Sequence, residues 1–357
     1  MKGRCKLMGK SQKRYVWVDY IKIFACLLVV FGHLYMSMMA GGWIKETARY
    51  YCWPVQTIYT FHVPLFFICS GFLYQSSNKN KEWTLEKHVK NVKRKWLALG
   101  VPYFTFSIIT LVLKIVFSSE VNNQATPILR TLFIEPIAPY WYLYTLFFLF
   151  CIVPYFKDKQ LMKKIFVGAV FFKVLYVVWL CNFNLPDIVN KILANLVWFL
   201  LGMLISEIYM SKTRRSSDLI KDWINVVILG VGLGISWIYY SKPLENNVLQ
   251  FVIGSCMIFP ILYFFMSISP DKEGRFVHKL NQYFMPVYVL HTIIAAMLRS
   301  ILLKIGIANF LLHFSIELIA SILIPIVIYE IASKNWILLF WFEPVKALKM
   351  KRKKNEN

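Results

Sequence analysis

Residues 16–39 read VWVDYIKIFACLLVVFGHLYMSMM, and this stretch decides how the chain folds. It is apolar and long enough to cross a bilayer as one helix, yet it carries Asp19, Lys22 and His33. Eleven residues at about 100° each return to nearly the same face of a helix, so Lys22 and His33 lie on one stripe about 16 Å apart. Ionisable groups inside a membrane helix are costly and are usually functional. This stripe is therefore the first indication of what the chain does.

Apolar runs of this kind recur along the whole chain. The 357 residues are 58% hydrophobic, and runs of about 18–24 apolar residues are the signature of helices that cross a membrane. The pattern predicts an all-α fold, a polytopic integral membrane bundle of about ten transmembrane helices. The predicted spans are residues 17–39, 54–75, 96–118, 140–156, 164–181, 189–210, 223–240, 247–268, 284–304 and 311–333.

The basic residues predict which way these helices run. The formal net charge is +23, and lysines and arginines concentrate in alternate segments between the apolar runs, as the positive-inside rule requires. Both termini are therefore predicted to be cytoplasmic, with residues 1–344 as the membrane domain and residues 345–357 as a basic cytoplasmic tail. The predicted inside segments are residues 1–16, 76–95, 157–163, 211–222, 269–283 and 334–357.

Two further classes of function are disfavoured by composition. No nucleic-acid-binding motif accompanies the positive charge, so membrane lipids rather than nucleic acid are the expected partners. The seven cysteines are scattered, with no CxxC pair and no metal-ligand spacing. We therefore expect neither a metal site nor a disulfide framework.

His33 is the strongest candidate for chemistry. At a rise of about 1.5 Å per residue, it lies roughly 24 Å from the inner end of its helix, in the outer half of the membrane. A neutral imidazole there can act as a general base towards a hydroxyl group that arrives from outside. The alternative is a buried histidine that is hydrogen-bonded to a neighbouring helix.

The cytoplasmic end of the same helix offers cations. Lys22 and Asp19 are spaced i, i+3, so they either pair and reach the interface, or Lys22 meets a phosphorylated cofactor that enters from the cytoplasm. A second basic cluster lies on the same side of the membrane, just before the third span. It contacts lipid headgroups or nucleotide phosphates, and it consists of Lys90, Lys93, Arg94 and Lys95.

Other polar residues in the spans have both packing and functional interpretations. His62 enters from the outer side, at a depth near that of His33, and Ser70 and Gly71 allow a close approach of helices. Arg299 and Glu317 are expected to pair across neighbouring helices. Three residues at helical spacing, Asn195, Trp198 and Gly202, are expected to pack helices together. Trp141 begins a span at the outer face. Tyr288 and His291 lie in the inner half of the ninth span.

These blocks together resemble a known family. Residues 14–22, RYVWVDYIK, running on to residues 29–33, VVFGH, resemble the opening of the acyltransferase 3 family. This family contains integral membrane acyltransferases, including bacterial O-antigen and exopolysaccharide O-acetylases. The resemblance covers essentially the whole chain, in order, and its further blocks are residues 61–72, 93–103, 139–143, 195–202 and 288–291.

The resemblance implies an activity and roles for the candidate residues. It implies transfer of an acyl group, above all acetyl, from cytoplasmic acetyl-CoA or another acyl-CoA to a hydroxyl of an extracytoplasmic glycan or lipid-linked sugar, in a bacterial cell membrane. The implied catalytic residues are His33 as general base, His62 and Asp19. The implied donor-binding residues are Lys22, Lys90, Lys93, Arg94 and Lys95, and the implied substrate-binding residues are Trp141, Tyr288 and His291.

The chain departs from the family pattern at its cations. Many members carry arginine where this chain has Lys22, and lysine keeps the charge but loses bidentate recognition of phosphate. The paired arginines that many O-acetylases have before the third helix are reduced to Arg94 among lysines. The departure bears on how acyl-CoA is bound.

A second function also fits a membrane bundle of this kind. The chain would then transport a small polar solute such as serine, or export a polysaccharide, without forming a covalent bond; both have been suggested for proteins resembling this family. A cytoplasmic basic cluster and an outer-half histidine favour the enzyme, because they suit a reaction whose two substrates arrive from opposite sides. Two measurements distinguish these functions. Labelled acetyl that appears on a product indicates the enzyme, and labelled solute that crosses vesicles without acyl-CoA indicates the transporter.

Overall fold

The computed structural model describes residues 14–44, 49–78, 81–117, 127–211, 219–239, 247–270, 274–307 and 309–356. All regular structure within these ranges is helical, and eight of the helices described there are long and apolar enough to span a membrane. The all-α polytopic bundle is thereby confirmed, whereas the sidedness of the termini stays a prediction. The eight comprise α1 (Val16–Ala40), α2 (Arg49–Asn78), the continuous segment Leu85–Val116, α8 (Asp187–Ser211), α9 (Leu219–Tyr239), α10 (Asn247–Ile268), α12 (Phe284–Lys304) and α13 (Phe310–Ala332).

The two remaining predicted spans also coincide with helices. Residues 140–156 contain α6 (Trp141–Ile152), which is apolar but short, and residues 164–181 overlap α7 (Lys159–Val178), which carries lysines. A 12-residue helix reaches only about 18 Å. The helices α6 and α7 therefore coincide with predicted spans but are not among the eight.

One boundary differs clearly from the prediction. The third span was expected to begin at residue 96, but the helix begins eleven residues earlier, as α3 (Leu85–Lys95), and continues through a π-turn, η1 (Trp96–Gly100), into α4 (Val101–Val116). Thr84 starts it by accepting a hydrogen bond from the backbone N–H of Lys87, as an N-cap residue does. The basic cluster therefore lies on a helix rather than in a loop.

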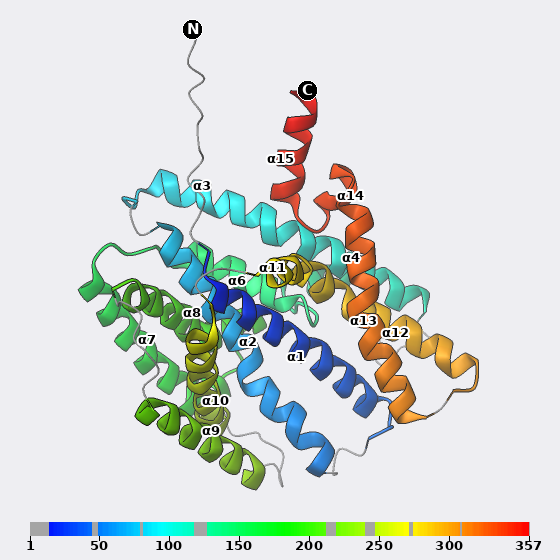
Figure 1. Cartoon of the computed structure of the whole chain (residues 1–357), viewed down its shortest axis with the longest axis horizontal. Helices are drawn as coiled ribbons and strands as arrows, with labels where there is room; N and C mark the ends of the chain where they lie inside the picture. The colour runs from blue at the N-terminus through cyan, green and yellow to red at the C-terminus, as the bar shows by residue number, and fades with distance from the viewer. Residues whose placement is uncertain are drawn as a thin grey trace.

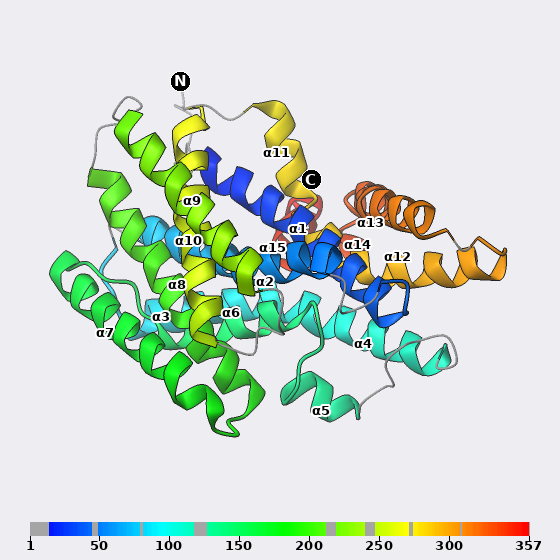
Figure 2. The same cartoon turned by 90° about the horizontal axis from the view of Figure 1, so that it is seen from below.

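The helix α2 is central to the bundle. In Figures 1 and 2, α7, α8, α9 and α10 lie on one side of α1 and α2, while α12 and α13 lie on the other. A Cβ atom on Gly71 of α2 would lie 1.9 Å from the carbonyl oxygen of Phe199, and one on Gly202 of α8 would lie 2.0 Å from that of Ile68. Only glycine permits such backbone contact. The packing roles predicted for Gly71 and Gly202 are confirmed.

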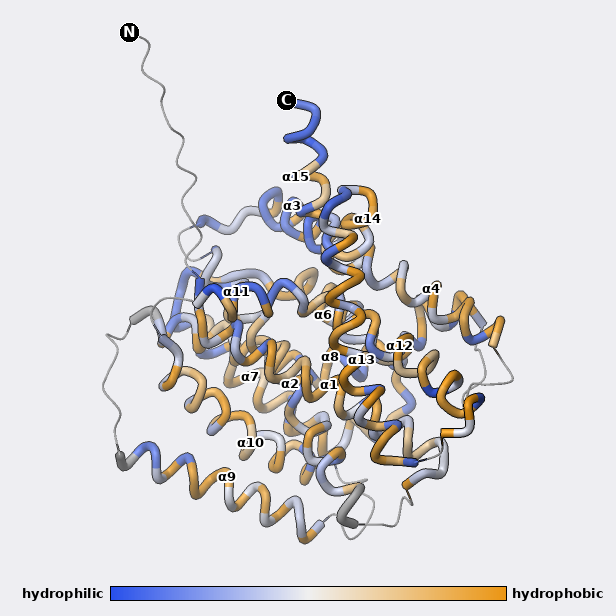
Figure 3. Tube along the Cα trace, turned by 45° about the vertical axis from the view of Figure 1, so that its right-hand side comes forward, coloured by the Kyte–Doolittle hydropathy of each residue, from blue (hydrophilic) through white to orange (hydrophobic). Residues whose placement is uncertain are grey.

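Polar and apolar elements are segregated along the bundle. Figure 3 shows hydrophilic stretches of α3, α11 (Arg275–Gln282) and α15 (Pro344–Asn355) towards one end, with the apolar helices beyond them. These three elements come from three of the predicted inside segments. We call this the basic end of the bundle.

Shorter elements complete the fold: α5 (Ile128–Phe133), η3 (Leu180–Asn182) and α14 (Trp336–Phe340).

The predicted pairing of Arg299 with Glu317 is confirmed. The guanidinium of α12 donates twice to the carboxylate of α13, Nε to Oε1 at 3.2 Å and Nη2 to Oε2 at 2.6 Å. Glu317 is fully buried, and the side chain of Arg299 is 12% exposed. His313 Nδ1 lies 3.3 Å from the same carboxylate, and His313 Nε2 lies 2.6 Å from the Ile307 carbonyl oxygen. We call these residues the Glu317 network.

Candidate active site

A cavity of about 310 Å³ lies among α1, α2, α6, α7, α8, α10 and α12. Its lining includes Val177 near the end of α7, Asn195 in the first part of α8, Gln250 near the start of α10, and Pro139 just before α6. By the predicted topology these helix ends are adjacent to outer loops. The cavity therefore lies towards the end of the bundle away from the basic end.

Two of the predicted histidines meet in this cavity. His33 of α1 and His62 of α2 both line it. The ring of Tyr59 lies between them, with centroid distances of 6.2 Å to His33 and 4.8 Å to His62. The two histidines were predicted to lie at similar depth, whereas Tyr59 was not predicted. Its position three residues before His62, on the same helix face, was the available signal.

A third histidine lies directly against His33. The ring of His291 on α12 has its centroid 5.3 Å from that of His33. His33 lines the cavity whereas His291 does not, so His291 packs against a wall residue of the cavity. Of the predicted substrate-binding residues, Trp141 and Tyr288 do line the cavity, and the Tyr288 hydroxyl donates to the Pro139 carbonyl.

The depth predicted for His291 was wrong. The sequence placed it in the inner half, below His33, because its helix was assumed to start at the membrane surface. Cys26 Sγ instead lies 4.0 Å from the carbonyl oxygen of Phe284, the first residue of α12. Cys26 and Phe284 are thus at one level. His33 lies seven residues after Cys26 on α1, and His291 lies seven residues after Phe284 on α12, a rise of about 10 Å in each helix. The helix α12 therefore begins well inside the bundle.

Hydrogen bonds fix the orientation of two imidazoles. His62 Nδ1 lies 2.7 Å from the Ile58 carbonyl oxygen, and His291 Nδ1 lies 2.9 Å and 3.0 Å from those of Tyr288 and Val287. A carbonyl only accepts, so each Nδ1 carries the proton, and in the neutral ring Nε2 carries a lone pair. Among the described residues, His291 Nε2 is buried without a hydrogen-bond partner. Both rings thus keep an acceptor nitrogen.

The cavity also contains a lysine that the sequence analysis missed. Lys173 of α7 is 8% exposed, and its Nζ donates to the Ala194 carbonyl oxygen at 2.9 Å. The rule that singled out Lys22 was sufficient to find it, because Lys173 also interrupts an apolar run. Asn195, predicted only to pack, lines the cavity as well, and its Nδ2 donates to the Lys191 carbonyl oxygen at 2.8 Å.

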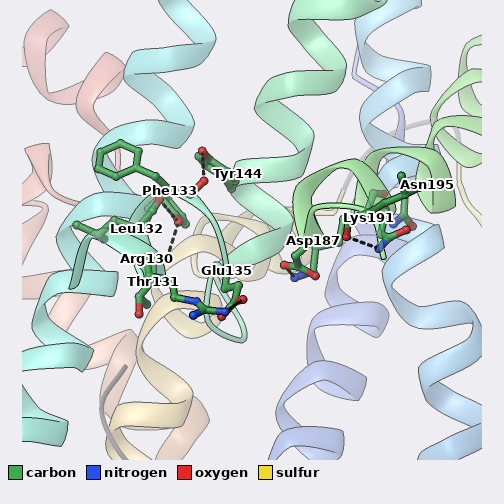
Figure 4. Close-up of polar contacts among 12 residues, drawn as sticks. Arg130, Thr131, Leu132, Phe133, Glu135, Tyr144, Asp187, Lys191 and Asn195 are labelled. Carbon is green, nitrogen blue, oxygen red and sulfur yellow. Dashed lines mark hydrogen bonds and ion pairs between the residues drawn. The ribbon is translucent and has the colours of Figure 1, made fainter. Parts of the chain in front are cut away.

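The rim near Asn195 carries two ion pairs. Figure 4 shows Lys191 paired with Asp187 along α8, and Arg130 of α5 paired with Glu135, which lies just after that helix. The Lys191 ammonium also lies 5.3 Å from the centroid of the Trp141 ring. Each charged group drawn there therefore already has an opposite charge beside it.

The predicted donor-binding cluster is divided by the structure. Lys90, Lys93 and Arg94 are exposed on α3, whereas Lys95 is partly buried, with its Nζ 3.9 Å from the centroid of the Phe150 ring. Lys22 is partly buried and makes no ion pair with any described residue. The ammonium groups of Lys22 and Lys95 are close enough to repel each other. Two cations thus face the interior near the basic end.

Asp19 is paired neither with the cavity histidines nor with Lys22. Its Oδ2 accepts a hydrogen bond from Arg14 Nε at 2.7 Å, so the alternative pairing with Lys22 was wrong. Asp19 lies fourteen residues before His33 on α1, about 21 Å away along the helix. The structure does not bring this carboxylate to the histidines.

Three aromatic residues of the cavity lining, Phe66, Tyr142 and Tyr288, pack in one cluster with Phe284. The Phe66 ring lies 5.5 Å from that of Tyr142 and 5.3 Å from that of Phe284, and Tyr142 lies 5.9 Å from Tyr288. Phe284 is level with Cys26, between Lys22 and His33 in height. We call these four residues the aromatic partition.

Fold and site together define a polytopic membrane protein with a histidine-lined cavity at one end and two partly buried cations towards the other. Comparison with known proteins gives the family. The family model described as an acyltransferase domain, that of the acyltransferase 3 family, matches residues 15–330, and the chain belongs to this family of membrane acyltransferases.

The comparisons also found a distant relative. The nodulation protein NolL of Mesorhizobium japonicum is 26% identical over 155 residues, which make up 43% of this chain and 38% of that protein. The match thus spans well under half of the relative's length. No solved structure gives a significant match.

Proposed function

We propose that this protein transfers an acyl group, above all acetyl, from cytoplasmic acyl-CoA to a hydroxyl of an extracytoplasmic glycan or other cell-envelope acceptor. The observation that carries the proposal is that His33 and His62 line one cavity, and that His291 packs against His33 with its buried Nε2 left without a hydrogen-bond partner among the described residues. Membership of a membrane acyltransferase family supports the reaction class.

In the proposed reaction, His33 is the general base. Its imidazole accepts the proton of the acceptor hydroxyl while the hydroxyl oxygen attacks the thioester carbonyl carbon. The C–S bond breaks, the thiolate takes the proton from the imidazolium, and free CoA and an ester are the products. The lone pair on His291 Nε2 suits it to position His33 and to stabilise the imidazolium. His62 lines the same cavity, and its Nε2 carries the lone pair.

The donor is proposed to reach the cavity from the basic end. A cavity of about 310 Å³ is at the lower limit for a drug-sized ligand, so the nucleotide of CoA is expected to stay outside it. Lys22 and Lys95 would then hold phosphates through point charges rather than bidentate forks. Only the acyl group and the thin arm behind it need to pass the aromatic partition.

The experiment uses the purified full-length protein in lipid nanodiscs, with acetyl-CoA labelled on the acetyl group and a hydrolysate of envelope glycans as acceptor. We expect label on a glycan product, with equimolar free CoA, and neither with His33→Ala. Control vesicles test transport with labelled serine and no acyl-CoA. Uptake of serine without labelled product would replace this proposal by the transporter. Label transfer that survives His33→Ala would remove His33 from the reaction.

A further inference from the structure

Lys173 is a buried cation that makes no ion pair with any carboxylate in the described part of the chain. The residue is 8% exposed and lies in the wall of the cavity. Buried lysines are almost always paired, because taking an unpaired ammonium out of water is costly. An unpaired lysine that faces a cavity therefore calls for an explanation.

The contacts of Lys173 satisfy it only in part. One ammonium proton goes to the Ala194 carbonyl oxygen, and the rings of Tyr176 and Phe251 lie 5.1 Å and 5.5 Å from Nζ. An ammonium has three protons to donate, and aromatic faces attract a cation without removing its charge. Within the part of the chain that the structure describes, no carboxylate lies within ion-pair distance of Nζ. The nearby carboxylate on α8, Asp187, is already paired with Lys191.

The neighbourhood of Lys173 is suited to binding an anion. Asn195 and Gln250 line the same cavity, and the amide of Asn195 uses one of its N–H groups on the Lys191 carbonyl oxygen, which leaves the second. These residues come from α7, α8 and α10, which lie on one side of α1 and α2 (Figures 1 and 2), whereas the lining histidines, His33 and His62, come from α1 and α2 themselves. The cavity thus has a histidine side and a cationic amide side.

We propose that the acceptor carries an anionic group, a carboxylate or a phosphate, which binds Lys173 while a hydroxyl of the same molecule faces His33. This inference rests on the proposed function, because it names the class of acceptor for the same cavity. The bound anion supplies the charge that the protein lacks at Lys173 and takes up the two remaining ammonium protons. A single sugar unit matches a cavity of about 310 Å³.

The test measures binding without any acyl donor, so that it does not depend on transfer. Full-length protein in nanodiscs is titrated with three probes of similar size: methyl glucuronoside, glucose 6-phosphate and neutral methyl glucoside. The variants are Lys173→Met, Lys173→Arg and the matched control Lys164→Met, which removes an exposed lysine from the same helix. Thermal unfolding of each variant checks that it is folded.

We expect at least one charged probe to bind roughly tenfold or more tightly than the neutral one, which corresponds to a charge-assisted hydrogen bond. Lys173→Met should abolish this preference, Lys173→Arg should keep most of it, and Lys164→Met should leave it intact. A preference for the uronate over the phosphate, or the reverse, identifies the anion.

Equal binding of charged and neutral probes, or a charge preference that survives Lys173→Met, overturns the inference. Transfer assays with the same sugars then separate the two proposals. Lys173-dependent binding of an anion without any acyl transfer sinks the proposed function but keeps the anion site. Efficient transfer to neutral acceptors that is unaffected by Lys173→Met keeps the proposed function but overturns the anion site.

Discussion

Two buried histidine sites in this bundle differ in what their ring nitrogens do. His313, in the Glu317 network, is fully buried and has an oxygen within 3.3 Å of each ring nitrogen. His291 is equally buried, but its Nε2 has no hydrogen-bond partner within the described ranges. Its neighbour His33 makes no hydrogen bond to any described residue. Burial alone therefore does not distinguish a structural histidine from one that is available for chemistry.

The comparison suggests a rule for this molecule. A histidine whose two nitrogens are both engaged holds helices together, and removing it should lower stability. A histidine with a free nitrogen beside a cavity is costly to keep, and removing it should lower activity. The predictions below test this division.

The largest expected effect is on activity, at His33. His33→Gln keeps a polar side chain but removes the base, and general-base catalysis contributes roughly 100- to 10,000-fold. We expect the rate of acetyl transfer to fall by that factor, with thermal stability almost unchanged. The matched variant His313→Gln should show the reverse: a lower thermal midpoint and a rate per folded molecule within a few-fold of the parent. More than a tenth of the parent rate in His33→Gln would contradict the assignment.

The next effect is on stability, in the Glu317 network. Glu317→Ala leaves Arg299, whose side chain is 12% exposed, without its counter-charge, and breaking a buried pair in this way costs about 3–5 kcal/mol. The measurement is unfolding in detergent, followed by the transfer rate of the folded fraction, which should be unchanged. The double variant Arg299→Met with Glu317→Leu removes both charges and should recover much of the loss. If the double variant is no more stable than Glu317→Ala, an unpaired charge is not the cause.

A smaller effect is expected where α2 meets α8. Gly202→Ala places a Cβ 2.0 Å from the Ile68 carbonyl oxygen, and overpacking of this kind costs about 1–3 kcal/mol. Because α2 carries His62 and α8 carries Asn195, we expect the transfer rate to fall together with stability, unlike in the Glu317 network. Gly234→Ala on α9, whose Cβ would meet nothing within 4 Å, is the control and should be neutral or slightly stabilising. Equal effects of the two substitutions would show that the contact is loose.

Much of this architecture was predictable, because a bilayer imposes length and polarity on each helix separately. All ten predicted spans coincide with helices, and the contacts at Gly71, Gly202, Arg299 and Glu317 followed from residue type and position along a helix. His33 and His62 were likewise placed at one depth, and both line the cavity. Properties that depend on one helix at a time can thus be predicted from the sequence.

Properties that depend on two helices were harder to predict. The height of His291 was wrong because the start of α12 is set by packing against Cys26, which periodicity along one helix does not reveal. The partner of Asp19 was wrong because Arg14, just before α1, turns back to it. Lys173 was missed for another reason: it lies in a span whose other lysines at the inner end suggested only topology.

The smallest effect is expected at the exposed counterpart of the Glu317 network, the pair of Arg130 and Glu135 at the rim (Figure 4). The hydrogen bond from Arg130 lowers the pKa of Glu135. A carboxylate with a lowered pKa stabilises the fold above its ordinary pKa, about 4.3, and this contribution is lost as the pH falls through the lowered value. Glu135→Gln should therefore shift the thermal midpoint only slightly at pH 7, and the difference from the parent should shrink as the pH falls below about 4. High salt should also erase it, because exposed charges are screened, while the effect of Glu317→Ala should persist. A shift at Glu135 that matches Glu317→Ala, or that resists salt, would mean that this rim pair is as shielded from water as the buried network.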